Sequence, residues 1–146
     1  MRVHIALVLC VLAGASRLAS EEQAFALIVS RSNPLSAVKR QEVAKLFLKK
    51  STRWSDGREA LPVDQSLRSP VRTAFTKDVL AVEGMGQTSA VESYWLQQVY
   101  SGRGNPPAVK PTDAEVVAFV ASNQGAVGYV SAQADVASVK ILRVEQ

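Results

Sequence analysis

The sequence predicts an α/β fold in which a mixed sheet is flanked by helices. Its 146 residues are enough for one hydrophobic core and too few for two large domains. Apolar runs of strand length alternate along the chain with segments whose apolar residues recur at helical spacing. The sequence contains neither an internal repeat nor a low-complexity tract. These observations together indicate a single domain with one core.

Residues 1–20 are predicted to be a secretory signal peptide, and residues 21–146 the folded domain. A short basic start, with Arg2, precedes an apolar run at residues 5–13 that is too short to span a bilayer. Small residues at 13–16 and 18–20 offer two cleavage positions. We therefore expect an exported, periplasmic protein without stable membrane insertion after cleavage.

The only histidine and the only cysteine, His4 and Cys10, both lie in this leader. A mature chain without them has no Ser-His-Asp triad, no Cys nucleophile, no thiolate zinc site and no disulfide. We therefore expect no metal, no cofactor and no enzymatic activity. Cleavage after Ser20 lowers the net charge from +4 to +2, and no basic stripe remains for nucleic acid.

The N-terminal half of the domain is predicted to contain two strands and a helix. Residues 24–29 are continuously apolar, which suits a strand covered on both faces. Apolar residues at helical spacing predict a helix over about residues 36–50. Residues 60–63 form a short strand that brings Asp64 to its carboxyl end, and Pro62 indicates either an edge strand or a strand start.

Three further helices follow. Ser69 and Pro70 are typical of the N-cap and first helical positions, and apolar residues up to Leu80 share one face of that helix. A second helix is predicted over residues 89–100, before a Gly- and Pro-rich loop at 101–107.

A capping box starts the last helix and two strands close the domain. Thr112 followed by Glu115 predicts a helix over residues 113–122. Residues 126–130 and 138–144 are predicted to be strands.

The order of several short motifs resembles that of the substrate-binding proteins of phosphate ABC transporters. It is more similar to the short phosphate-binding-like proteins that hold about one lobe of that two-lobed, periplasmic-binding-protein-like fold. The resemblance covers residues 25–144. Its motifs are Ser32-Asn33-Pro34, Trp54-Ser55-Asp56-Gly57, Pro62-Val63-Asp64-Gln65, Ser69-Pro70-Val71-Arg72, Tyr94-Trp95, Gly102-Arg103-Gly104 and Gln124-Gly125-Ala126-Val127-Gly128-Tyr129-Val130.

This resemblance implies a single periplasmic-binding-protein-like lobe that binds inorganic phosphate or a related oxyanion. It also implies association with phosphate uptake of the ABC type, with a transporter or envelope protein as partner. The family's Ser-Gly-Thr run at the start of a helix is replaced here by Ser69, Pro70 and Val71. Pro70 has no N–H to donate, and one lobe alone leaves a site open to water, so binding is expected to be weak.

The candidate site follows from a strand that ends at Asp64 and a helix that opens at Ser69. Such a loop gathers backbone N–H groups and the positive end of a helix dipole, which favours an oxyanion. The arginines can donate charge-assisted hydrogen bonds to phosphate, and Asp64 can select a protonated oxyanion. The candidate ligand-binding residues are Asp64, Gln65, Ser66, Arg68, Ser69 and Arg72.

An alternative interpretation needs no ligand. Ser69 then only caps its own helix, and Arg68 and Arg72 are solvated. The protein would be a protein-interaction or structural module of the cell envelope that retains one lobe of the binding-protein fold. Pro70 favours this alternative, whereas Arg68 and Ser69 favour the anion.

Overall fold

The computed structural model describes residues 24–146, and the predicted signal peptide lies outside these residues. The strands are β1 (Phe25–Val29), β2 (Ala37–Lys39), β3 (Leu61–Gln65), β4 (Ala108–Lys110), β5 (Ala126–Ser131), β6 (Lys140–Ile141) and β7 (Arg143–Glu145). The helices are α1 (Arg40–Phe47), α2 (Pro70–Asp78), the 3-10 helix η1 (Leu80–Glu83), α3 (Thr88–Tyr100) and α4 (Asp113–Ser122).

The main sheet has the strand order β4-β3-β5-β1-β6. Strand β3 runs parallel to both neighbours, whereas β1 runs antiparallel to β5 and β6. A small parallel sheet pairs β2 with β7. The mixed sheet flanked by helices confirms the predicted fold class, and it places the carboxyl ends of β3 and β5 at the same edge.

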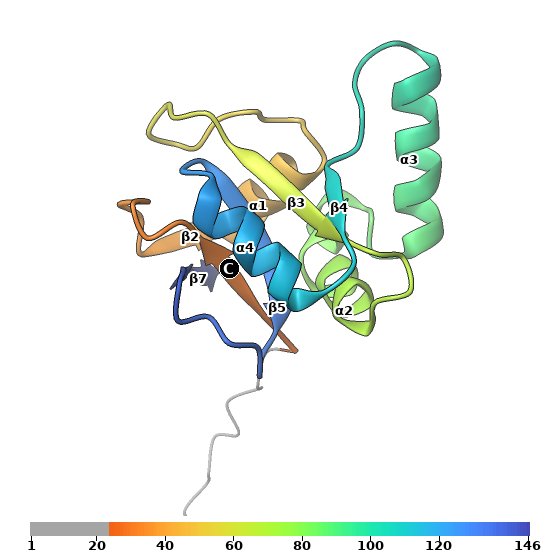
Figure 1. The fold of residues 1–146 in the computed structure, drawn as a ribbon. Helices are drawn as coiled ribbons and strands as arrows, with labels where there is room; N and C mark the ends of the chain where they lie inside the picture. The colour runs from red at the N-terminus through yellow and green to blue at the C-terminus, as the bar shows by residue number, and fades with distance from the viewer. Residues whose placement is uncertain (1–23) are drawn as a thin grey trace, which may run out of the picture.

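Helices cover both faces of this sheet (Figure 1). Helix α4 packs on one face, where Val116 and Val120 join Val63 in one buried cluster. Helices α1 and α2 pack on the other face. There the rings of Phe75 and Tyr129 stack with centroids 4.0 Å apart. Because side chains alternate along a strand, successive residues of β3 point to opposite faces of the sheet and so toward different helices.

Two predicted elements are wrong in their bounds. The predicted helix at 36–50 begins only at Arg40, because residues 37–39 form β2 and pair with β7 in a register that aligns Val38 with Val144. The predicted strand at 138–144 is two strands in different sheets, divided at the buried Leu142. Both errors arise from pairing between distant segments, which local periodicity does not show.

The prediction that Pro62 marks either an edge strand or a strand start is confirmed in its second form. Pro62 stands at the start of β3, as expected, but β3 is an interior strand. The N–H of Leu61 donates to the carbonyl oxygen of Gly125 beside β5, so the nitrogen of Pro62 faces the other side. Strand β4 pairs with β3 only from Val63 onward, and the missing N–H therefore costs no sheet hydrogen bond.

The helix-start signals are confirmed. Ser69 occupies the N-cap of α2 with Pro70 at its first position, and Thr112 caps α4 by accepting a hydrogen bond from the N–H of Glu115. The loop at 101–107 is confirmed too, although it leads into the unpredicted strand β4. None of the helices within residues 24–146 has the length and apolar character needed to cross a membrane.

Candidate functional site

The candidate site lies where β3 ends and α2 begins. The structure brings four of the six predicted residues into one hydrogen-bonded network: Asp64, Gln65, Ser69 and Arg72. The side chains of Ser66 and Arg68 do not join this network.

Asp64 and Arg72 form an ion pair that is largely buried. The distance from Arg72 Nη2 to Asp64 Oδ2 is 3.3 Å, and each side chain is only 11% exposed. The second guanidinium nitrogen, Nη1, donates to the carbonyl oxygen of Gln65 at 2.7 Å. Arg72 is therefore turned back toward the end of β3 and is held there by two acceptors.

Asp64 also receives hydrogen bonds from its strand neighbours. The Tyr129 hydroxyl and the backbone N–H of Gln65 both donate to Asp64 Oδ1, the latter at 2.9 Å. Burial raises the pKa of Asp64, while Arg72 and Tyr129 act against this rise. Burial, together with the carboxylate of Asp64, raises the pKa of Tyr129 well above its ordinary value. Tyr129 thus stays a hydrogen-bond donor to Asp64 at neutral pH.

The Gln65 side chain connects the two helix layers at this edge. Its Nε2 donates to Asp113 Oδ1 at 2.8 Å and to the carbonyl oxygen of Tyr129 at 2.9 Å. Its Oε1 accepts from the Ser69 hydroxyl at 2.9 Å. The Ser69 side chain therefore makes no capping hydrogen bond to α2, contrary to the alternative interpretation of this residue.

Asp113, at the start of α4, extends the network to β5. Its Oδ2 accepts from the Ser131 hydroxyl at 2.6 Å, and its Oδ1 accepts from the Ser131 N–H at 3.2 Å. Burial favours a higher pKa for Asp113, but the hydrogen bonds from Ser131 and Gln65 outweigh it and lower the pKa. Asp113 is therefore an ionised acceptor that anchors Gln65 at neutral pH.

Arg68 is the one predicted arginine left facing solvent. It is exposed, and its guanidinium makes neither a hydrogen bond nor an ion pair with any residue between 24 and 146. Its backbone N–H lies 3.4 Å from the half-buried Ser66 hydroxyl oxygen. Arg68 and Ser66 are thus the donors of this segment that remain free to meet a ligand.

Sequence reasoning missed three members of this network: Tyr129, Asp113 and Ser131. In the sequence, Asp113 is marked only as part of a helix start, and the strand at 126–130 is marked only by its apolar residues. The available signal was the position of Tyr129, whose hydroxyl needs a hydrogen-bond partner inside a buried strand. Its partner, Asp64, is 65 residues away in the sequence.

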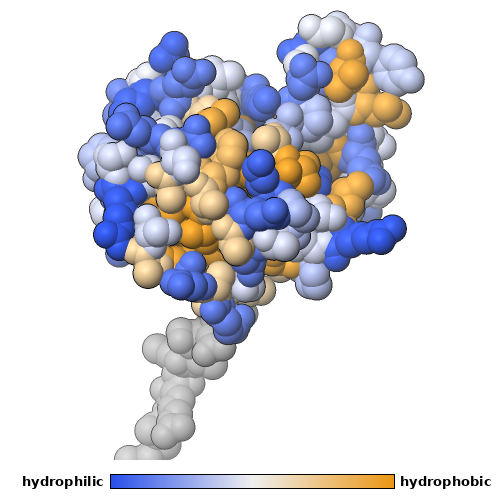
Figure 2. All heavy atoms as spheres, in the orientation of Figure 1, coloured by the Kyte–Doolittle hydropathy of each residue, from blue (hydrophilic) through white to orange (hydrophobic). Residues whose placement is uncertain are grey.

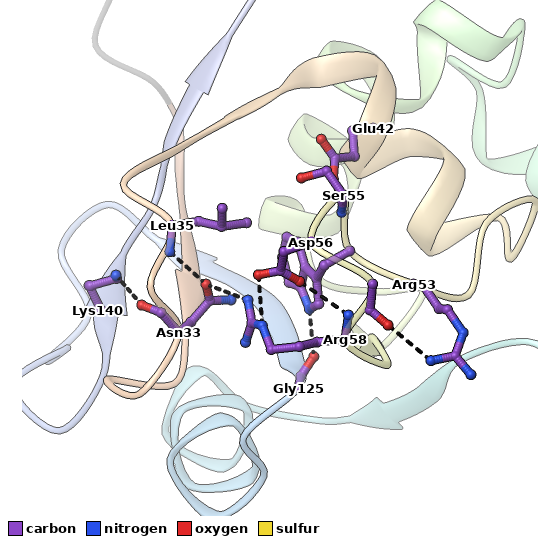
Figure 3. Close-up of polar contacts among 11 residues, drawn as sticks. Asn33, Leu35, Glu42, Arg53, Ser55, Asp56, Arg58, Gly125 and Lys140 are labelled. Atoms are coloured by element: carbon purple, nitrogen blue, oxygen red, sulfur yellow. Dashed lines mark hydrogen bonds and ion pairs between the residues drawn. The ribbon is translucent and has the colours of Figure 1, made fainter.

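A second polar cluster lies at the opposite edge of the sheet and is shown in Figure 3. Arg58 donates to Asp56 Oδ2 at 2.7 Å and to Asn33 Oδ1 at 3.1 Å. The indole of Trp54 donates to the carbonyl oxygen of Gly125 at 3.2 Å, and Lys140 donates to the carbonyl oxygen of Asn33. These contacts tie together the loops that enter and leave β1, β3 and β5, which is a structural role.

Asn33 is the most buried member of this cluster, at 1% exposure. Its Oδ1 accepts from Arg58 and from the N–H of Leu35, whereas its Nδ2 has no acceptor within residues 24–146. Two of the motifs that carry the family resemblance, Ser32-Asn33-Pro34 and Trp54-Ser55-Asp56-Gly57, contribute residues to this cluster rather than to the end of β3. The Gln124 to Val130 motif contributes to both places, through Gly125 here and through Tyr129 at the end of β3.

Neither polar cluster offers a metal site. Within residues 24–146, no group of three or more His, Cys, Asp or Glu side chains is arranged to hold a metal ion.

Comparison with known proteins assigns the chain to a known domain family. The family model for the PBP superfamily domain matches residues 23–142. A search of curated proteins found no match.

Several solved structures are similar to the fold. A protein described as a phosphate ABC transporter substrate-binding protein from Clostridium perfringens, solved with bound phosphate, aligns with a TM-score of 0.63 and 20% identity over 83% of this chain. An ABC-type phosphate transport receptor from Vibrio cholerae aligns with a TM-score of 0.60 and 19% identity over 84% of this chain. This chain spans 44% and 47% of the length of those two proteins. At such identities, the likeness shows the fold of one lobe.

Proposed function

The chain belongs to the PBP superfamily domain family, and from this membership we propose a function. We propose that the chain is an exported protein that binds phosphate or a related oxyanion weakly. The observation that carries the proposal is the exposed side chain of Arg68, which has no hydrogen-bond or ion-pair partner within residues 24–146 and lies in the loop that opens α2, two residues after Ser66. Structural neighbours described as phosphate-binding or phosphate-transport proteins support the choice of anion. Association with ABC-type phosphate uptake forms part of the same proposal.

In this proposal, the two arginines have different tasks. Arg68 supplies the charge-assisted hydrogen bonds to the anion because no carboxylate within residues 24–146 neutralises it. Arg72 is neutralised by Asp64, and together they fix the backbone of the loop through the carbonyl oxygen of Gln65. The N-terminus of α2 adds favourable electrostatics, reduced by the absence of an N–H at Pro70.

One observation favours the second candidate function, a ligand-free interaction or structural module of the cell envelope. The polar side-chain atoms of Gln65, Ser69 and Arg72 already have partners within the protein. A ligand that used these groups would have to break existing hydrogen bonds. Anion binding therefore depends on Arg68 and Ser66, and removal of Arg68 distinguishes the two functions.

Phosphate titration followed by backbone amide NMR tests the site. We expect shifts centred on residues 66–72, with a dissociation constant on the order of millimolar, about 4 kcal/mol at the standard state. Arg68→Ala should weaken binding by roughly ten- to a hundredfold, because a charged hydrogen bond is worth about 1.5 to 3 kcal/mol. Arg143→Ala, which removes an arginine that is 74% exposed in β7, is the matched control and should bind as the wild type does.

Titrations with sulfate and with chloride at equal ionic strength separate oxyanion binding from screening. If tens of millimolar phosphate move no amide in this segment, or if Arg68→Ala binds phosphate as well as the wild type, the anion proposal fails. The interaction module then becomes the better account of the fold.

Export is tested by the N-terminus of the mature protein. We expect the protein recovered from the periplasm to begin between Ser16 and Glu22, as the short apolar run and the small residues after it predict. Edman sequencing or intact mass measures this directly. A recovered chain that still contains residues 7–12 would contradict both the export proposal and the loss of His4 and Cys10.

A further inference from the structure

Helix α3 is attached to the rest of the domain along one side only. Val91 and Trp95 are buried against the core, and the Tyr94 hydroxyl donates to the carbonyl oxygen of Leu48 at 2.7 Å. From these contacts the helix projects away from the sheet, and its C-terminal end stands clear of the other helices (Figure 1).

The projecting part of α3 exposes large apolar side chains. Leu96 is 60% exposed, Val99 is 48% exposed and Tyr100 is 84% exposed. Figure 2 shows hydrophobic residues at the upper right, over this end of the helix. A single exposed apolar residue needs no explanation, but three on one side of one helix indicate a contact surface.

Charges of opposite sign flank these apolar residues. Glu92, Leu96 and Val99 are spaced by four and three residues, which places them along one stripe of α3. Arg103 follows the end of α3, and its N–H donates to the carbonyl oxygen of Gln98 at 2.9 Å, so it stays beside the last turn. Neither Glu92 nor Arg103 has an ion-pair partner within residues 24–146.

We propose that this stripe binds the same stripe of a second copy of the chain, with the two α3 helices antiparallel. A two-fold axis between Gln97 and Gln98 aligns Leu96 with Val99 of the second copy. The same axis aligns Glu92 with Arg103 of the second copy, and symmetry makes each contact twice. A parallel arrangement would place like charges together, so the charge order selects the antiparallel one.

The proposed contact is small. One side of a thirteen-residue helix buries less area than a standard stable interface, so the dimer should be weak and reversible. We expect a dissociation constant on the order of 100 μM. The contact uses no residue of the candidate anion site, so its test and the phosphate titration can fail separately.

Sedimentation equilibrium of the purified protein between about 10 μM and 1 mM, without phosphate, tests the proposal. Glu92→Arg and Arg103→Glu should each weaken self-association at least tenfold, because each places two like-charge pairs in the dimer. The double variant Glu92→Arg/Arg103→Glu exchanges the charges and should restore the wild-type constant to within about threefold. Lys77→Glu, an exposed charge reversal in α2, is the control and should dimerise as the wild type does.

Circular dichroism of each variant checks that the fold is intact, and Leu96→Asp should abolish the dimer. A wild type that is monomeric up to 1 mM would overturn the proposal. A dimer that both single reversals leave unchanged, or that the double variant does not restore, would overturn it as well.

Discussion

Arg72→Ala is expected to lower the free energy of unfolding by about 3 kcal/mol at pH 7, measured by urea denaturation. The substitution leaves the Asp64 carboxylate buried, with its counter-ion removed from 3.3 Å away. It also deprives the carbonyl oxygen of Gln65 of the hydrogen bond from Arg72. Losses of this size follow when one partner of a buried ion pair is removed, because the remaining charge is uncompensated.

This loss should depend on pH in a defined direction. Burial already raises the pKa of Asp64 in the folded protein, and Arg72 limits that rise. In Arg72→Ala the folded-state pKa of Asp64 rises further, while the unfolded chain keeps its ordinary value of 3.8. Well below pH 3.8 both states hold the proton and the charge penalty is absent. The penalty grows as the pH rises through the folded-state pKa and is constant above it.

The double variant Asp64→Asn/Arg72→Ala is the matched control. It removes the uncompensated charge and should recover most of the lost stability at pH 7. It should also lose the pH dependence that distinguishes Arg72→Ala from the wild type. A loss below about 1 kcal/mol for Arg72→Ala, equal at pH 4 and pH 7, would show that the pair contributes little to stability.

Gly125→Ala is expected to cost roughly 2 to 3 kcal/mol, again measured by urea denaturation. An added Cβ would lie 2.3 Å from the carbonyl oxygen of Glu59, which belongs to the backbone and cannot rotate away. The shift needed to relieve this contact would disturb the hydrogen bonds that the Gly125 carbonyl oxygen accepts from Leu61 and Trp54. The start of β3 and the start of β5 would both be affected.

Gly86→Ala is the control for the substitution itself. A Cβ there meets only the Ala81 side chain and backbone, at 3.1 Å and beyond, so the expected change is much smaller. If Gly125→Ala is as stable as Gly86→Ala, the close approach of Gly125 to Glu59 is not a constraint on this fold.

Elements with local signals could be predicted from the sequence. The apolar run of β1, the Pro at the start of α2 and the capping box of α4 each act through neighbouring residues. The three-residue strands β2 and β4 carry no such signal. They exist because a distant segment pairs with them, and a single sequence does not show that pairing.

The sequence predicts where the candidate site lies, but it does not predict which of its side chains bond to one another. Strand alternation sends Asp64 toward α2 and Gln65 toward α4, which follows from β3 once the layers are known. The contacts of Asp64 come from two other elements: Arg72 of α2 turns back onto Oδ2, and the Tyr129 hydroxyl of β5 donates to Oδ1. Sequence reasoning treated both arginines alike, and their different surroundings separate them.

The position of β1 between β5 and β6 has a consequence for how the chain reaches its folded state. Phe25 pairs with Ser131, and Val29 pairs with Lys140, across more than a hundred residues of sequence. The first strand therefore has no sheet partner until the last strands have been synthesised. Pairing over such separations makes folding slow and keeps the early apolar segment exposed in the nascent chain.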